Sequence, residues 1–159
     1  MEGQFLVGDW VQVEGENRSV GGTVEEIRMR TTLLRDVEGT LHIVPNGEIG
    51  IASNFTRGWA RAVVDIDIYY KEDIDAVLKV LREACKKAAR EMELSGEITQ
   101  GPEVQGVQEL TGRNVVVRVV ARTTPFSKWD VGRELRGVLV RELEQNGITL
   151  GRGVASGGA

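Results

Sequence analysis

The sequence predicts a mixed fold in two parts, a small all-β barrel in residues 1–58 and an α+β domain in residues 59–150. In the first part, short stretches with apolar residues at every second position alternate with glycine-containing turns, which is typical of strands. Beyond Gly58-Trp59, strand-like stretches alternate with two longer ones in which apolar residues recur every three or four positions, as in amphipathic helices. Residues 151–159 are rich in glycine and predict a flexible tail.

Five short strands are expected in the first part. After a turn at Gly8-Asp9 and with a break at Gly21-Gly22, they lie at residues 10–14, 24–31, 32–35, 41–44 and 53–56. In the second of these strands the apolar positions change phase between Val24 and Ile27, so we expect a β-bulge near Glu25-Glu26. Five short strands, the second strongly bent, indicate a small open barrel of the Sm-like type. In a ring, its edge strands would pair with neighbouring subunits.

The segment 39–47 has the clearest boundaries of these strands. Gly39 closes the preceding turn because it can adopt a positive φ. Leu41 and Ile43 share one face, so we expect a short buried strand. Pro45 has no N–H to give to a neighbouring strand and therefore ends it. Asn46-Gly47 is expected to form a left-handed turn.

The second part predicts the order strand, helix, strand, strand, helix and short strand. Val64, Ile66 and Ile68 share one face of the first strand. The helices are expected at residues 73–92 and 127–146, with Gly147 ending the second. A loop at 93–102 precedes strands at 103–110, with a bulge at Gly106, and at 114–122, and a final strand is expected at 148–150. This is the split βαβ of a ferredoxin-like sandwich, with a right-handed first crossover.

Composition excludes several classes of function. The net charge of −4 argues against general binding of nucleic acid. A single cysteine, Cys85, and a single histidine, His42, support neither a disulfide, nor a zinc site, nor a Ser-His-Asp arrangement. The glycines follow no phosphate-binding pattern. We therefore expect no enzyme, no cofactor and no metal site.

The remaining candidate side chains have ordinary structural interpretations. His42 is interpreted as a surface or interface residue rather than a pH switch, and Cys85 as a buried, inert thiol. Asp65 and Asp67 share a strand face that we interpret as solvated, in preference to an acid–base or cation site.

Arg28, Arg30 and Arg35 form a basic cluster. We favour pairing with nearby acidic residues. The alternative is contact with anions in a vestibule or with lipid headgroups.

Four segments in a fixed order carry a resemblance to a known family. They are Phe5-Leu6-Val7-Gly8-Asp9-Trp10-Val11, Gly22 to Thr32, Gly39 to Gly47 and Ala52-Ser53-Asn54-Phe55-Thr56-Arg57. In this order the chain resembles the cytoplasmic part of the small-conductance mechanosensitive (MscS) ion channel family, and the resemblance continues to about Ile148. The matching motif residues, which we expect to be structural, are Gly8, Asp9, Gly22, Gly39, Pro45, Asn46 and Asn54.

The resemblance implies a homoheptameric ring and a hollow vestibule below the pore. These would lie on the cytoplasmic side of the bacterial inner membrane and pass ions and small solutes during osmotic release. No apolar run approaches the roughly 20 residues that a membrane helix needs, and the first residues do not form a signal peptide. We therefore expect a soluble piece without the pore-forming helices. The proline- and aromatic-containing segment with which the family continues into an axial barrel does not follow the last helix here, so the sequence leaves the presence of that barrel open. The alternative hypothesis is an Sm-like RNA-binding module with an attached ferredoxin-like domain.

Overall fold

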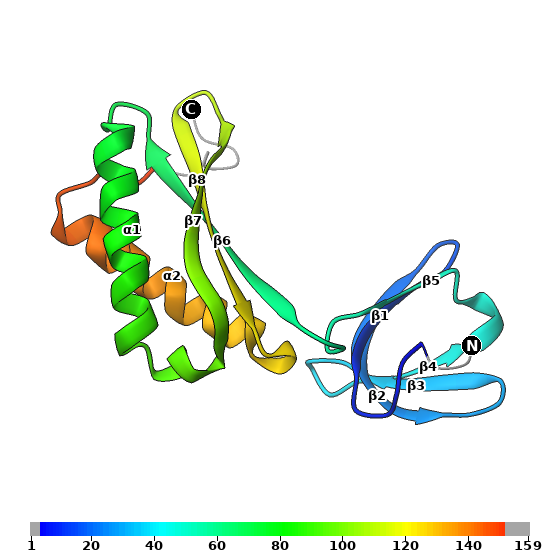
Figure 1. The fold of residues 1–159 in the computed structure, drawn as a ribbon. Coiled ribbons are helices and arrows are strands. Elements are labelled where there is room, and N and C mark those ends of the chain that lie inside the picture. The colour runs from blue at the N-terminus through cyan, green and yellow to red at the C-terminus, as the bar shows by residue number, and fades with distance from the viewer. Residues whose placement is uncertain (1–3, 152–159) are drawn as a thin grey trace. The chain divides into compact units, whose positions relative to one another are not determined.

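A computed structural model describes residues 4–151 of the chain, which divide into two compact units (Figure 1). Among the described residues, the first unit ends at Ala60 and the second begins at Arg61. Each unit has its own cluster of buried apolar side chains. The tail that the sequence predicts lies, apart from Gly151, outside the described residues.

The first unit is an antiparallel sheet of five strands, so the all-β prediction is confirmed. The strands are β1 (Trp10–Glu14), β2 (Ser19–Ile27), β3 (Thr31–Arg35), β4 (Leu41–Pro45) and β5 (Ile51–Asn54), in the spatial order β4-β3-β2-β1-β5. Among the described residues β4 and β5 are not paired with each other, so the sheet does not close into a barrel. The pairing of β2 with β3 shifts register between Val24 and Glu26, which confirms the predicted bulge.

Gly21-Gly22 lies inside β2, so the predicted break at this point is wrong. The two glycines serve close packing instead of a turn. A Cβ on Gly21 would lie 2.7 Å from the Trp10 ring, and one on Gly22 would lie 2.6 Å from the backbone oxygen of Arg35. Neighbouring groups occupy the space that a side chain would need at both positions, so close packing requires glycine there. The strand continues through both residues.

The expectation of a buried strand at 41–44 is also wrong. Leu41 is 37% exposed and Ile43 is 62% exposed. The reason is that β4 is an edge strand, and only Val44 packs against the buried cluster of Phe5, Val11, Val13, Val24 and Leu34. Gly39 has the predicted positive φ of 86°. Asn46-Gly47 begins a 3₁₀ helix, Asn46–Glu48, because neither residue adopts the left-handed conformation.

The second unit contains a three-stranded sheet and two helices. Its elements are β6 (Ala60–Tyr69), α1 (Ile74–Glu91), a 3₁₀ helix (Glu93–Glu97), β7 (Ile98–Leu110), β8 (Asn114–Thr123), a second 3₁₀ helix (Pro125–Ser127) and α2 (Lys128–Gln145). The sheet order is β6-β8-β7, and Leu150 forms a bridge with Ile68 on β6. Because β8 lies between β6 and β7, the order is that of a split βαβ, and the ferredoxin-like prediction is confirmed.

Strand β7 begins at Ile98, five residues before the predicted start. Gly101 and Pro102 made this region resemble a loop in the sequence. The strand accommodates them because β7 is the edge of its sheet and the register shifts between Gln100 and Glu103. A further shift between Val104 and Gly106 confirms the bulge predicted at Gly106.

Both helices occupy the predicted positions to within one residue. The Asp73 side chain caps α1 by accepting hydrogen bonds from the backbone N–H groups of Asp75 (3.0 Å) and Ala76 (3.4 Å). Gly147, with φ +70°, ends α2 as predicted. The apolar stripes of the helices pack on one face of the sheet and form about half of the larger core, including Val77, Leu81, Ala84, Cys85, Ala88, Leu135, Leu139 and Leu143.

Candidate functional site

The predicted motif residues all lie in the five-stranded unit, where Gly8, Asp9, Asn46 and Asn54 take part in two separate polar networks. The first network surrounds Asp9, in the turn before β1. One carboxylate oxygen of Asp9 accepts hydrogen bonds from the backbone N–H of Leu6 (2.8 Å) and the side-chain amide of Asn54 (2.8 Å). The backbone N–H of Gly8 donates to the oxygen of Val24 (2.8 Å). These bonds attach the turn to both β2 and the end of β5.

Thr56 completes the Asp9 network, although the sequence did not identify it. Its hydroxyl lies 3.2 Å from the other Asp9 carboxylate oxygen and accepts a hydrogen bond from the backbone N–H of Trp10 (3.0 Å). Burial raises the pKa of Asp9. Hydrogen bonds from Leu6, Asn54 and Thr56, with the charge of Arg57, outweigh that effect, so the pKa lies below its ordinary value. The spacing Asn-x-Thr could have identified Thr56 from the sequence, because the Thr56 backbone N–H donates to the side-chain oxygen of Asn54 two residues earlier (3.0 Å).

The second network surrounds Asn46, directly after Pro45 at the end of β4. The Asn46 side-chain amide donates to the backbone oxygens of Arg28 (3.1 Å) and Met29 (3.3 Å). Its side-chain oxygen accepts from the hydroxyl of buried Thr32 (2.6 Å). The Asn46 backbone N–H donates to Arg30 (2.8 Å). Asn46 therefore contacts the backbone of each residue from Arg28 to Arg30 in the turn between β2 and β3, and Met29 at the tip of the turn is 95% exposed.

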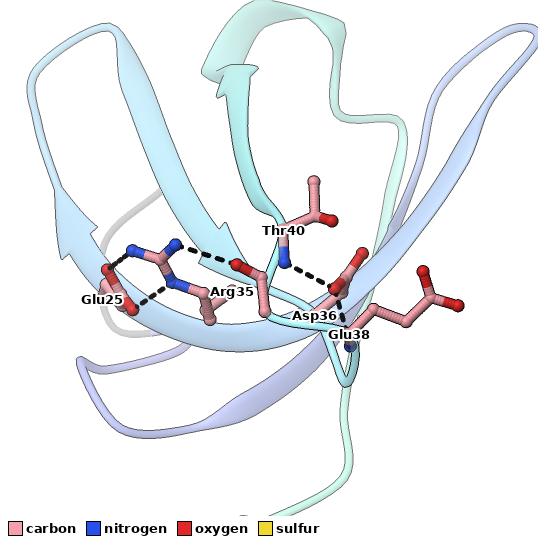
Figure 2. A network of polar contacts seen from close by, with 6 residues as sticks. Glu25, Arg35, Asp36, Glu38 and Thr40 are labelled. Carbon is pink, nitrogen blue, oxygen red and sulfur yellow. Dashed lines mark hydrogen bonds and ion pairs between the residues drawn. The ribbon is translucent and has the colours of Figure 1, made fainter.

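Two residues of the basic cluster are held by neighbouring carboxylates. Figure 2 shows the Arg35 guanidinium between Glu25 and the turn that ends at Thr40. It donates to both carboxylate oxygens of Glu25 (2.7 and 3.1 Å) and to the Gly39 backbone oxygen (3.0 Å). Arg28 forms a similar two-bond pair with Glu26 (2.8 and 3.0 Å). Arg30 forms no ion pair with any residue among 4–151. The three arginines are therefore not a concentrated positive site.

The turn between β3 and β4 depends on Asp36. Its carboxylate accepts hydrogen bonds from the backbone N–H groups of Glu38 and Thr40, both at 2.9 Å (Figure 2). The other oxygen lies 2.8 Å from Nε2 of half-buried His42. The His42 bond and these backbone bonds lower the pKa of Asp36. His42 thus has a local partner within its own hairpin.

The remaining candidates lie in the second unit, apart from the motif residues. Cys85 is 4% exposed, and burial raises the pKa of its thiol to about 11, so the thiolate that would react is disfavoured. Asp65 forms a two-bond pair with Arg118 on β8 (2.8 and 2.9 Å). Among the described residues, no three His, Cys, Asp or Glu side chains are close enough to hold a metal ion. Neither described helix has the length and apolar character needed to cross a membrane.

The geometry defines a class of protein with two units. The first is a five-stranded β unit whose turns are held by hydrogen bonds from side-chain amides and carboxylates, and the second is a ferredoxin-like unit with a larger apolar core. Comparison with family models identifies both parts. Residues 1–57 match the β-domain of the mechanosensitive ion channels, and residues 62–150 match the C-terminal domain of the mechanosensitive ion channel MscS. The chain belongs to the MscS family of mechanosensitive ion channels, which are channels and not enzymes.

Relatives in bacteria agree with this assignment. The chain is 36% identical over 148 residues to the small-conductance mechanosensitive channel of Caldanaerobacter subterraneus subsp. tengcongensis, with 93% of this chain and 50% of the relative covered. It is 28% identical over 152 residues to a moderate conductance mechanosensitive channel of Escherichia coli, with 91% of this chain and 20% of the relative covered. The chain thus spans half or less of these relatives.

Solved structures show the same fold. The crystal structure of Helicobacter pylori MscS in its closed state superimposes with a TM-score of 0.76 at 19% identity, covering 99% of this chain and 60% of that one. The cryo-EM structure of Arabidopsis thaliana MSL1 gives a TM-score of 0.65 at 18% identity, covering 95% of this chain and 54% of that one. At these identities the likeness establishes the arrangement of elements.

Proposed function

We propose that this chain forms a ring below the pore of a mechanosensitive channel and encloses a hollow vestibule on the cytoplasmic side of the membrane. Ions and small solutes pass through openings in this vestibule during osmotic release, and the size and lining charge of the openings filter them. Membrane tension is sensed by transmembrane helices of the same protein. The present chain contributes geometry and charge, and the motif residues Asp9, Asn46 and Asn54 have a structural role in it.

The observation that carries this proposal is the pair of open edges in the five-stranded sheet. β4 and β5 end the sheet on its two sides, and no other strand of residues 4–151 pairs with their outer edges. Both edges display apolar side chains: Ile43 on β4 is 62% exposed and Ile51 on β5 is 60% exposed. Open edges of this kind are surfaces on which another strand can pair.

The two edges are different from each other, and this determines the symmetry of the assembly. Pairing β4 of one copy with β5 of the next is a heterologous contact, which generates a ring when the rotation closes. The family resemblance supports seven copies. An open groove of about 750 Å³ lies beside β4, lined by apolar residues such as Val44 and by charged residues such as Arg18 and Glu48, and offers a mixed surface to a neighbouring copy.

Engineered cysteines test the edge pairing directly. In the double variant Ile43→Cys/Ile51→Cys, oxidation forms a disulfide between β4 of one copy and β5 of the next. Denaturing gels without reductant will then show a ladder of cross-linked oligomers, and its largest band has the number of subunits in the ring. Light scattering and native mass spectrometry of the unmodified chain then give the number of subunits. Cys85 does not interfere, because it is buried in the core of the other unit.

The matched control places the same chemistry on an exposed side chain away from the edges. Val37 is 89% exposed in the turn between β3 and β4. The variant Val37→Cys/Ile51→Cys should give no ladder beyond the background of random collision. An equal ladder from both double variants, or none from the Ile43→Cys/Ile51→Cys variant, contradicts edge pairing.

A further inference from the structure

A second groove lies in the ferredoxin-like unit, between helix α1 and the edge strand β7. Its volume is about 520 Å³, which is within the range of small-molecule sites. Helix α1 contributes Lys79, Arg82 and Lys86, and β7 contributes Gly101, Pro102 and Glu103. No motif residue lies in this groove, so its charges are separate from the networks of the five-stranded unit.

The three cations have no evident structural task. The dipole of α1 favours positive charge only in the last turn, where Arg90 lies, whereas Lys79 and Arg82 are in the middle of the helix. Lys86 forms a pair with Glu83 at 3.2 Å, and both side chains are about two-thirds exposed, so this pair contributes little stability. Lys79 and Arg82 form no ion pair with any residue that the structure describes.

The spacing of these cations sets the kind of ligand they can bind together. Positions 79, 82 and 86 follow a helical repeat of three and four residues, so the side chains lie on one face of α1. Along the helix axis, Arg82 is roughly 4.5 Å and Lys86 roughly 10.5 Å from Lys79. A monovalent anion can contact only one or two of these groups. An anion with several charges in a row can contact all three.

We propose that the groove between α1 and β7 binds oligovalent anions, either oligophosphates or tricarboxylates, through Lys79, Arg82 and Lys86. The concave surface and the glycine-proline stretch of β7 hold the ligand against the helix. Glu83 competes with the ligand for Lys86, and Glu103 opposes negative charge at the groove wall, so binding is weak and sensitive to salt. The proposal concerns a single copy of the chain and does not depend on ring formation.

Titration with two probes, inorganic triphosphate and citrate, tests the site and separates its two ligand chemistries. Backbone amide NMR shifts of the full chain should change at Lys79, Arg82, Lys86, Gly101 and Glu103, with a dissociation constant of about 1 mM. Acetate at the same ionic strength is the control and should give no saturable change. Response to triphosphate alone assigns the site to phosphates, and response to citrate alone assigns it to carboxylates.

Variants that change affinity in opposite directions distinguish a site from general attraction. The double variant Lys79→Gln/Arg82→Gln should weaken triphosphate or citrate binding by about tenfold or more. Glu83→Gln should tighten it by about threefold, because Lys86 is released. The matched control Arg113→Gln/Arg136→Gln removes two exposed charges outside the groove and should leave the affinity unchanged.

Three results would overturn the proposal. The first is the absence of saturable shifts with both probes up to about 10 mM. The second is an equal loss of affinity in the groove variant and in the Arg113→Gln/Arg136→Gln control, which would indicate attraction by overall charge. The third is a set of shift changes that maps away from α1 and β7. Unchanged helical circular dichroism in every variant ensures that lost binding is not lost folding.

Discussion

The two units of this chain are stabilised by different means. Among residues 4–151, the five-stranded unit buries five apolar side chains in its cluster, whereas the ferredoxin-like unit buries eighteen. The smaller unit instead uses Asp9, Asn46 and Asn54 to hold its turns. Its acidic residues exceed its basic ones by four, while the larger unit is balanced. Side-chain-to-backbone hydrogen bonds therefore define the small sheet where apolar burial is limited.

The largest expected effect is in the apolar core of the ferredoxin-like unit. Leu135 is fully buried on α2, so Leu135→Ala should lower the free energy of unfolding of this unit by about 3 kcal/mol, from lost burial and a residual cavity. Urea unfolding followed by helical circular dichroism measures it, because both α-helices belong to this unit. The control Leu110→Ala, at a position 75% exposed, should change little. Equal losses of unfolding free energy in Leu135→Ala and Leu110→Ala would contradict the distinction between core and surface positions.

The next effect tests close backbone packing in the five-stranded unit. The Cβ of Gly22→Ala would meet the Arg35 backbone oxygen at 2.6 Å, so the pairing of β2 with β3 must shift. We expect a loss of about 2 kcal/mol in the stability of this unit. Hydrogen exchange of the β2 amides measures the loss. Gly47→Ala, where the added methyl meets open space, is the matched control and should leave exchange unchanged.

A smaller effect depends on pH and on the Asp9 network. Because the pKa of Asp9 is lowered in the folded state, the unfolded state binds the proton more readily. The stabilisation is therefore fully present above the ordinary aspartate pKa of the unfolded state and is lost as pH falls below it, through the lower pKa of the folded state. In Asp9→Asn, the stability of the five-stranded unit should fall less steeply over this range. Denaturation at a series of pH values measures the slope.

Asp65→Asn provides the control for that experiment. Hydrogen bonding to Arg118 lowers the pKa of Asp65, which lies in the ferredoxin-like unit. The substitution should leave the acid sensitivity of the five-stranded unit unchanged. If both variants reduced the pH dependence of the stability of the five-stranded unit equally, the two units would not respond separately to pH.

The smallest effect is a gain in stability at Gly132 on α2. A Cβ at this position meets only the Cβ of Ala62, at an ordinary contact distance of 3.8 Å. Gly132→Ala should therefore raise the unfolding free energy of the ferredoxin-like unit by about 0.5–1 kcal/mol, since alanine favours helix more than glycine does. Thermal unfolding measures the change. A destabilised variant would show that α2 approaches the sheet more closely than this distance implies.

Local sequence patterns predicted most of the elements but not the roles of several residues. Helix periodicity placed α1 and α2, and Gly147 marked the end of α2, because these signals act within one or two turns. Gly21-Gly22 and Gly101-Pro102 misled the prediction. Whether a glycine or proline ends a strand depends on what lies beside it, and those neighbours are distant in the sequence. Thr32 and Thr56 were missed for the same reason, because their partners lie up to 47 positions away.

The sequence by itself determined the two-part organisation, the periods of the helices and strands, the bulge at Glu25-Glu26 and the channel family. These properties depend on residues that are close together or on an ordered series of turns. Only the tertiary structure decided that β4 is an exposed edge, that Asn46 holds the turn at Arg28–Arg30, and that Lys79, Arg82 and Lys86 border a groove with β7. Each of these requires distant segments to be placed side by side, because burial and hydrogen bonding depend on spatial neighbours and not on sequence neighbours.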